Sequence, residues 1–291
     1  MEMNSSAEWN ISSASYIGNP INNTVMYITK KVEYLLSNLE TCDECLIFCE
    51  DTILIPDHLV KKHTFIQTTN PQYEYSKFVS KLACEIEVKR RNMKYKLTKE
   101  GYYIGENVKV GKNAIIEPLS FLDHDVIIGD NAKIYAGAKI KNAVIGNNFI
   151  ASENSIIGSF GYLLARDEDN NHVRTPSLGK VYIGNNVEVG MHSNISVGSA
   201  GNTIIHNNVK IDALCYVGHD AILKSNVEIC AGVVIGGYVV LEQDSFIGMN
   251  STIRNRITIG EKAKVGMGSV VTKSIDSNIT VVGNPAKRLG K

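Results

Sequence analysis

His219 and Gly237, eighteen positions apart, are the residues of this sequence best suited to chemistry. A neutral imidazole can accept a proton from an attacking nucleophile, and a glycine backbone N–H can stabilise the oxyanion that forms on the attacked carbonyl. Acyl transfer needs both groups beside each other. The pair is useful only if the fold brings residues eighteen apart into contact, so the elements that carry them must be identified.

Those elements follow from apolar residues that recur at nearly every sixth position. A period of six fits neither an α-helix nor a simple strand, and it is the signature of a parallel β-helix built from hexapeptide repeats. Three hexapeptides form one triangular coil, so positions eighteen apart stack on neighbouring coils. His219 lies two residues after the apolar Val217, hence at a corner, and a backbone N–H of Gly236 or Gly237 is expected near its ring. The series runs through Ile104, Val110, Ile116, Leu122, Ile128, Ile134 and Ile140, slips by one residue to Ile145, Ala151 and Ile157, resumes at Ile183, Val189 and Ile195, and continues from Ile205 in steps of six to Val271.

The residues between these positions favour the same fold. Gly, Asn and Asp cluster there, as in IGNNVEVG, and they tolerate the positive φ that tight corners need. One branched aliphatic residue per side would fill a narrow interior, and about eight coils bury a continuous apolar column. A β-sandwich with chance spacing is the alternative, and the twelve in-register positions of the longest run argue against it.

The sequence divides into two expected domains, 1–100 and 101–291. The first lacks the six-residue period and alternates strand-like runs (TVMYIT, CLIFCE, HTFIQTT) with helix-like ones, which predicts a small α/β domain. The helix-like runs are KKVEYLLSNLE and a longer one after Thr69, which has proline in its first turn. The second domain is mainly β and ends in a tail, 272–291.

Two polar interruptions of the repeats, 158–180 and GSAGN at 198–202, are expected to build a site on one face. The larger opens with Phe160, Gly161 and Tyr162, which we expect to contact substrate.

The composition argues against several classes of protein. The formal net charge is zero, so no basic excess indicates a nucleic-acid partner. No apolar run has the length of a membrane span, and the polar N-terminus lacks the pattern of a secretory signal. Six cysteines in 291 residues do not indicate a disulfide framework. We therefore expect a cytoplasmic enzyme.

Cys42, Cys45 and Cys49 are close enough in sequence to suggest zinc, with His58 or Cys84 as a fourth ligand. The favoured interpretation is that they are buried as small hydrophobic residues, because Cys45 and Cys49 flank the apolar stretch of CLIF. We therefore expect no metal.

With these residues in view, the sequence resembles the UDP-acylglucosamine N-acyltransferases of lipid A synthesis. The resemblance is carried by Ser159-Phe160-Gly161-Tyr162, by 178–185, by Ile211-Asp212 and by Gly218-His219-Asp220. It implies a homotrimer of left-handed β-helices with active sites between subunits. It also implies that His219 is the general base and that Gly237 supplies the oxyanion N–H.

Three features depart from that family. Met26, Thr29 and Val32 stand where its uridine platform has two stacking aromatic residues, so the first domain either binds a nucleotide through others, such as Tyr27, Lys30 or Lys31, or has lost that role. Ser196-Val197-Gly198 replaces a charged D-R-G. The ending VVGNPAKR replaces a helical extension that docks acyl carrier protein, and it is similar to that of acetyltransferases that use coenzyme A.

The combined hypothesis is a nucleotide-sugar N-acetyltransferase that moves acetyl from acetyl-CoA to a UDP- or dTDP-linked amino-deoxyhexose. Asp212 is expected to orient His219. The predicted catalytic residues are His219, Asp212 and Gly237; those for substrate are Phe160, Gly161, Tyr162, His192 and Asn194; those for coenzyme A are Gly236, Gly237, Asn255, Lys273, Pro285, Lys287 and Arg288.

Three rival functions remain open. One is a sugar O-acetyltransferase, and another is an N-acyltransferase that depends on acyl carrier protein. The third is a zinc hydratase of the γ-carbonic anhydrase type, for which His192, His206 and His219 lack the close histidine pair that such a site uses.

Overall fold

The computed structural model describes residues 10, 11 and 13–290, which form two compact units. The first comprises the described residues up to Asn92 together with Gly161–Gly179 and Ser199–Gly201. The second comprises Met93–Phe160, Lys180–Gly198 and the described residues from Asn202 onward. The division therefore falls at Asn92 and not at residue 100, and most of the predicted interruptions group with the first unit.

The first unit is built on a parallel four-stranded sheet in the order β1-β2-β3-β4. The three strand-like runs of the sequence form β2, β3 and β4, as predicted. Their bounds are Ser13–Ala14 for β1, Thr24–Ile28 for β2, Leu46–Glu50 for β3 and Thr64–Thr68 for β4.

Three helices accompany this sheet: η1 (Lys30–Thr41), α2 (Asp57–Val60) and α3 (Pro71–Arg90). The predicted helix after Thr69 is α3, whose Asn70 side chain accepts a hydrogen bond from the Tyr73 N–H and so caps the first turn. The run KKVEYLLSNLE forms a 3₁₀ helix with a kink at Val32. In that helix residues three apart share a side, which buries Leu36 and Leu39 together.

The larger interruption forms an antiparallel hairpin of β16 (Leu163–Arg166) and β17 (His172–Thr175). It belongs to the first unit because its neighbours pack there. The Thr175 hydroxyl lies 3.0 Å from that of Ser76, and Leu178 and Ala200 join an apolar cluster with Phe78.

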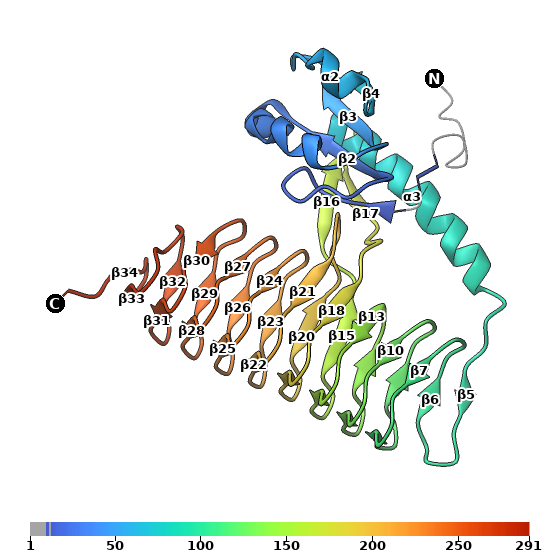
Figure 1. Ribbon diagram of the computed structural model, residues 1–291, viewed down its shortest axis with the longest axis vertical. Coiled ribbons are helices and arrows are strands. Elements are labelled where there is room, and N and C mark those ends of the chain that lie inside the picture. The colour runs from blue at the N-terminus through green and yellow to red at the C-terminus, as the bar shows by residue number, and fades with distance from the viewer. Residues whose placement is uncertain (1–9, 12, 291) are drawn as a thin grey trace. The chain divides into compact units, whose positions relative to one another are not determined.

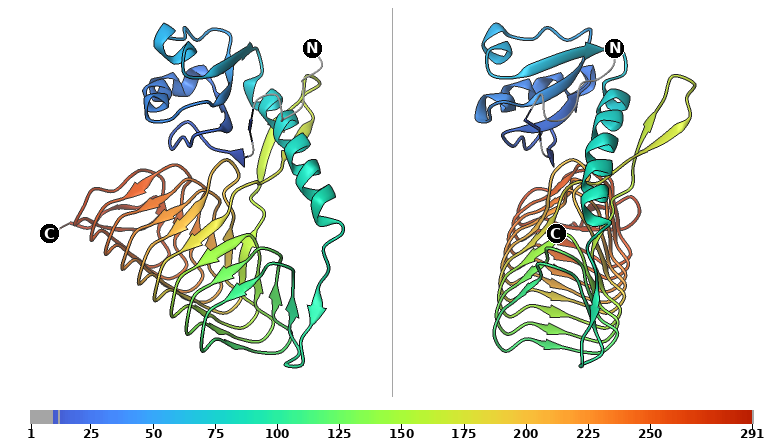
Figure 2. Two further views of the ribbon diagram at one scale, coloured as in Figure 1. Left: turned by 45° about the vertical axis from the view of Figure 1, so that its right-hand side comes forward. Right: turned by 90° about the vertical axis from the view of Figure 1, so that its right-hand side faces the viewer.

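The second unit is a left-handed parallel β-helix (Figure 1). Its coils stack on one another in both views of Figure 2, and each side of the coil is a sheet. The first side holds β7 (Lys109–Val110), β10 (Ile127–Ile128), β13 (Ala143–Ile145), β18 (Val181–Ile183), β21 (Thr203–Ile205), β24 (Ile222–Leu223), β27 (Val240–Leu241) and β30 (Thr258–Ile259).

The other two sides have ten strands each. The second side holds β8 (Ile115–Ile116), β11 (Lys133–Ile134), β14 (Ile150–Ala151), β19 (Glu188–Val189), β22 (Lys210–Ile211), β25 (Glu228–Ile229), β28 (Phe246–Ile247), β31 (Lys264–Val265), β33 (Thr280–Val282) and β34 (Lys287–Arg288). The third side holds β5 (Lys96–Leu97), β6 (Tyr103–Ile104), β9 (Phe121–Leu122), β12 (Lys139–Ile140), β15 (Ile156–Ser159), β20 (Asn194–Ser196), β23 (Tyr216–Val217), β26 (Val234–Ile235), β29 (Thr252–Ile253) and β32 (Val270–Val271).

The predicted six-residue series is confirmed. Its members lie in these strands, and all from Leu122 onward are buried in one apolar column. Asparagines turn the corners with positive φ, as at Asn131 and Asn148, and the Asn131 amide donates to Asn148 Oδ1 at 3.0 Å. The same residue types that permit the turn therefore also tie one coil to the next.

The described part of the predicted tail, 272–290, continues the β-helix. β33 pairs with β31, and β34 pairs antiparallel with β33. The Val270 N–H donates to Gly283 O at 3.0 Å, and the Ala286 N–H donates to Val270 O at 2.8 Å, so this segment closes the last coil. No helix among the described residues is both long and apolar enough to cross a membrane.

The buried column predicts a sharp contrast between adjacent residues of β10. Ile128 is 2% exposed and Ile127 is 39% exposed. We expect Ile128→Ala to lower the free energy of unfolding by about 2–5 kcal/mol, because it leaves a cavity in the column. Ile127→Ala, the matched control, should change it by about 0.5 kcal/mol or less. Urea midpoints followed by circular dichroism measure both; equal shifts would contradict the inward orientation of Ile128.

Candidate functional site

The register of the third side aligns the corner residues that follow its strands. Val217 pairs with Ile235, Ile235 with Ile253 and Ile253 with Val271. His219, Gly237, Asn255 and Lys273, each two residues after one of these, therefore occupy the same corner on four successive coils. We call these four residues the corner column.

His219 is the histidine of this column. Its Nδ1 lies 2.8 Å from Asp220 Oδ2, and the two side chains are 14% and 2% exposed. The Asp220 backbone N–H in turn donates to the Thr203 hydroxyl at 3.0 Å. A carboxylate at this distance accepts the Nδ1–H, which leaves Nε2 unprotonated in the neutral ring and able to accept a proton.

Gly237 lies against Nε2 of His219. A Cβ built on Gly237 would lie 2.8 Å from both Cε1 and Nε2 of His219, so only glycine leaves room for the ring. The flanking N–H groups are used by the fold, since Gly236 donates to Ile253 O and Tyr238 donates to His219 O. Within the described part of the chain no acceptor is found for the Gly237 N–H. It is therefore available to an external oxygen, whereas the Gly236 N–H is not.

Two aromatic and cationic contacts hold the ring in place. The Tyr238 ring meets His219 edge-on at 5.1 Å between centroids, and the Arg256 guanidinium lies 4.2 Å above the Tyr238 ring. Neither Tyr238 nor Arg256 was predicted from the sequence as a site residue, although Arg256 directly follows Asn255, which was predicted to bind coenzyme A.

A chain of polar side chains lies on the third side. The Ser159 hydroxyl donates to Asn194 Oδ1 at 2.6 Å and lies 3.2 Å from the Ser196 hydroxyl, which in turn donates to the Tyr216 hydroxyl at 3.2 Å. Asn194 is a predicted substrate residue, whereas the other three were not predicted to contact substrate. Tyr216 is three residues from His219, so this chain ends on the strand that leads to the corner.

The remaining predicted substrate residues are differently placed: Phe160, Tyr162 and His192 are exposed, whereas Gly161 is buried. Phe160 belongs to the second unit, where Lys141 Nζ lies 5.6 Å from its ring centroid. Gly161 and Tyr162 belong to the first unit, where Arg174 donates to Gly161 O at 3.0 Å and stacks on the Tyr162 ring at 5.2 Å. His192 turns a corner with a φ of 57°. A substrate role for these residues remains a prediction.

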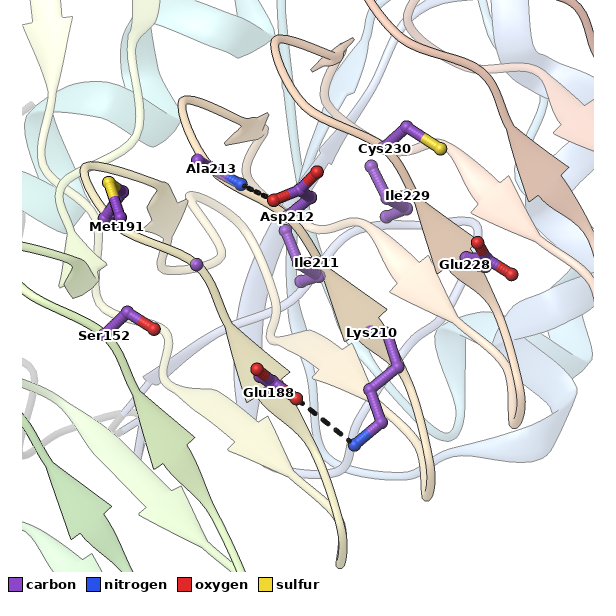
Figure 3. A pocket seen from close by; sticks show the side chains of 11 residues that line it. Ser152, Glu188, Met191, Lys210, Ile211, Asp212, Ala213, Glu228, Ile229 and Cys230 are labelled. Atoms are coloured by element: carbon purple, nitrogen blue, oxygen red, sulfur yellow. Dashed lines mark hydrogen bonds and ion pairs between the residues drawn. The ribbon is translucent and has the colours of Figure 1, made fainter.

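Asp212 does not make the contact that we expected of it. Its Oδ1 accepts from the Ala213 N–H at 2.7 Å, and it lines a hollow on the second side of the β-helix (Figure 3). An ion pair of Glu188 and Lys210, 3.7 Å apart, lies in the same hollow. The carboxylate beside His219 is Asp220, which follows it directly in sequence.

The residues predicted to bind coenzyme A fall into two groups. Lys273 and Asn255 are exposed in the corner column, and Arg254 and Arg256 flank Asn255 there. Lys287 and Arg288 are exposed in β34, at the end of the second side. Pro285 lies between the residues that bond to Val270 and thus caps the last coil.

The first unit offers no aromatic platform at the sequence positions considered. Met26 is fully buried, and Val32 packs against the same apolar cluster. The Tyr27 ring packs against that of Tyr75 at a tilt of 50°, with 5.1 Å between centroids, and Lys30 pairs with Glu33 at 2.7 Å. Lys31 is exposed.

The repeats match known families. Residues 107–142 and 202–237 match the bacterial transferase hexapeptide, and residues 238–273 match the hexapeptide repeat of succinyl-transferase. Solved structures with the same fold include a UDP-N-acetylglucosamine acyltransferase from Campylobacter jejuni, with a TM-score of 0.58 and 24% identity over 67% of this chain and 74% of that one. Another, from Francisella novicida, has a TM-score of 0.60 and 22% identity over 66% and 69%. The second unit thus has the fold of these structures, and parts of it match hexapeptide repeats.

The proteins that are similar in sequence have more specific names, but the similarity covers a smaller part of this chain than the structural matches do. The chain is 41% identical over 81 residues to UDP-3-O-acylglucosamine N-acyltransferase 2 of Legionella pneumophila, which is 28% of this chain and 23% of that protein. It is 31% identical over 109 residues to UDP-3-O-acylglucosamine N-acyltransferase of Hydrogenovibrio crunogenus, which is 37% and 31%. The chain thus spans less than a third of the length of these relatives.

The contact of His219 with Asp220 predicts which nitrogen of the neutral ring carries the proton. In the unaltered protein the Nδ1–H tautomer should dominate, because the carboxylate accepts that proton. Asp220→Ala should shift the ring toward the Nε2–H tautomer, and Asp212→Ala should leave it unchanged. Nitrogen-15 NMR of the His219 side chain reports the tautomer. If Asp212→Ala changed the tautomer as much as Asp220→Ala does, Asp212 and not Asp220 alone would orient the His219 ring.

Proposed function

We propose that this protein is a nucleotide-sugar N-acyltransferase that transfers acetyl from acetyl-CoA to the amino group of a UDP- or dTDP-linked amino-deoxyhexose. The observation that carries the proposal is the contact of His219 with both Asp220 and Gly237. It combines an oriented base with an unused backbone donor on neighbouring coils. Similarity to N-acyltransferases of UDP-linked sugars over part of the chain supports the acceptor class.

The reaction follows from these groups. The neutral amine attacks the thioester carbonyl, the C–N bond forms, and the carbonyl oxygen becomes an oxyanion that the Gly237 N–H stabilises. His219 Nε2 accepts the proton that the amine nitrogen loses, and Asp220 stabilises the imidazolium. The C–S bond then breaks, and His219 returns the proton to the departing thiolate. The products are an amide and free thiol.

The donor side is supported by positive charge along the corner column. Arg254, Arg256 and Lys273 follow Gly237 toward the end of the β-helix, and all three are exposed. Coenzyme A carries a pyrophosphate and a 3′-phosphate, and guanidinium and ammonium groups neutralise such phosphates. We propose that Lys287 and Arg288 bind the phosphates of coenzyme A that lie further from the thioester.

The acceptor side is supported by the polar chain on the third side. Ser159, Asn194, Ser196 and Tyr216 offer hydroxyl and amide groups suited to the hydroxyls of a sugar. In keeping with the resemblance, we propose that the active form is a homotrimer in which a neighbouring subunit completes each site.

Two rival activities use the same column. Transfer to a sugar hydroxyl would employ His219 in the same way, and a panel of amine and hydroxyl acceptors separates the two. Acyl carrier protein also presents a phosphate on its thioester arm, so the basic residues suit either donor. Comparing acetyl-CoA with acyl carrier proteins as donors at equal concentration separates these.

The role of His219 as general base can be tested by removing its side chain. His219→Ala should lower kcat for acetyl transfer at least about 10²-fold, because general base catalysis typically contributes roughly 10²–10⁴-fold. His58→Ala, which alters an exposed histidine of the first unit, is the control and should retain full turnover. Release of free thiol from acetyl-CoA measures both. Near-normal turnover of His219→Ala would remove this residue from the mechanism.

The binding of acetyl-CoA by the corner column can be tested at Lys273. Lys273→Ala should raise KM for acetyl-CoA about tenfold and leave kcat nearly unchanged, which corresponds to the loss of about 1.4 kcal/mol of binding free energy. Lys109→Ala, which alters an exposed lysine on the first side, should leave both constants unchanged. Steady-state kinetics with varied acetyl-CoA test this, and an unaltered KM in Lys273→Ala would exclude the column from donor binding.

A further inference from the structure

Two cysteine sulfurs and one histidine ring meet in the first unit. The side chains of Cys42, Cys45 and His63 are 1%, 2% and 6% exposed, and one potential ligand atom from each lies within 4.8 Å of the other two. Cys42 directly follows η1, Cys45 directly precedes β3, and His63 directly precedes β4. The register of β3 and β4 makes Cys45 and His63 neighbours.

The hydrogen bonds of His63 prepare its ring for a metal. Its Nε2 lies 2.9 Å from Leu39 O, a carbonyl that can only accept, so Nε2 carries the proton. Nδ1 is then unprotonated, and it accepts only a long hydrogen bond of 3.3 Å from the Cys45 N–H. A backbone carbonyl that fixes the far nitrogen is the usual support of a metal-binding histidine. Burial also lowers the pKa of His63, which favours this neutral form.

The two sulfurs have the spacing that a tetrahedral ion imposes. They lie 3.7 Å apart. Two sulfurs each about 2.3 Å from zinc at the tetrahedral angle would lie about 3.8 Å apart. Burial raises the pKa of Cys42 to about 12, so a thiolate there needs a cation beside it.

We propose that Cys42, Cys45 and His63 Nδ1 bind one zinc ion, with a water molecule as the fourth ligand. Thiolate and imidazole ligands select zinc among the common divalent ions. A surface hollow lined by Cys45, His63, Lys62 and Thr64 gives the fourth position access to solvent. The ion would tie the end of η1 to the starts of β3 and β4, and so stabilise the first unit.

The protein as purified under reducing conditions, and after dialysis against zinc sulfate, should contain one zinc per chain by plasma mass spectrometry. X-ray absorption at the zinc edge should find two sulfur and two nitrogen or oxygen neighbours. Cobalt substitution should give thiolate-to-cobalt charge-transfer bands and the d–d bands of a tetrahedral ion. These measurements need no variant, so they test the proposal even if a cysteine substitution prevents folding.

The variants then assign the ligands. Cys42→Ser and Cys45→Ser should each weaken zinc binding at least tenfold in competition with a chromophoric chelator, and His63→Gln should do the same. Cys84→Ser and Cys49→Ser, which alter cysteines outside the cluster, should bind as the unaltered protein does. Fewer than one zinc per ten chains after dialysis would overturn the proposal. A Cys42–Cys45 disulfide whose reduced form takes up no zinc, or unaltered binding by both serine variants, would also overturn it.

Discussion

The stacking of the β-helix coils is the constraint on which the rest of the structure depends. Each side contributes the aliphatic residue of its strand to a narrow interior, in many repeats together with a second one two positions earlier, as Val126 precedes Ile128. Each coil pairs its backbone with the next in parallel. Because the interior accepts one register only, corner residues eighteen apart must fall into line. That rule aligns His219, Gly237, Asn255 and Lys273, which are distant in sequence.

Two histidines at the same corner of the β-helix have different neighbours. His124 occupies the same corner as His219 on an earlier coil, but its Nδ1 accepts the Glu106 N–H at 2.8 Å and it is 3% exposed. The His124 ring is therefore buried and hydrogen-bonded to a backbone N–H. At His219 the imidazole is instead held by Asp220, and the absence of a side chain at Gly237 leaves Nε2 and a backbone N–H free on the same side. The difference lies in the neighbours of each ring.

The sequence was sufficient wherever a repeating pattern dictated the structure. The apolar series, the corner position of His219 and the strands β2, β3 and β4 of the first unit were predictable, since period and register follow from sterics. Asp220 was missed because its place beside the imidazole depends on a positive φ, 59°, which the spacing of residues does not reveal. The signal available was its adjacency to His219. His63 was missed because only the pairing of β3 with β4 brings it to Cys45.

The central claim is that this column moves an acyl group onto nitrogen. The most direct test is to incubate the protein with acetyl-CoA and UDP- or dTDP-linked sugars that carry an amino group or only hydroxyls, and to locate the acetyl group by tandem mass spectrometry. We expect an amide on one amino sugar, resistant to mild hydroxylamine. An ester that hydroxylamine removes, or acetylation of sugars that lack an amine, would contradict it.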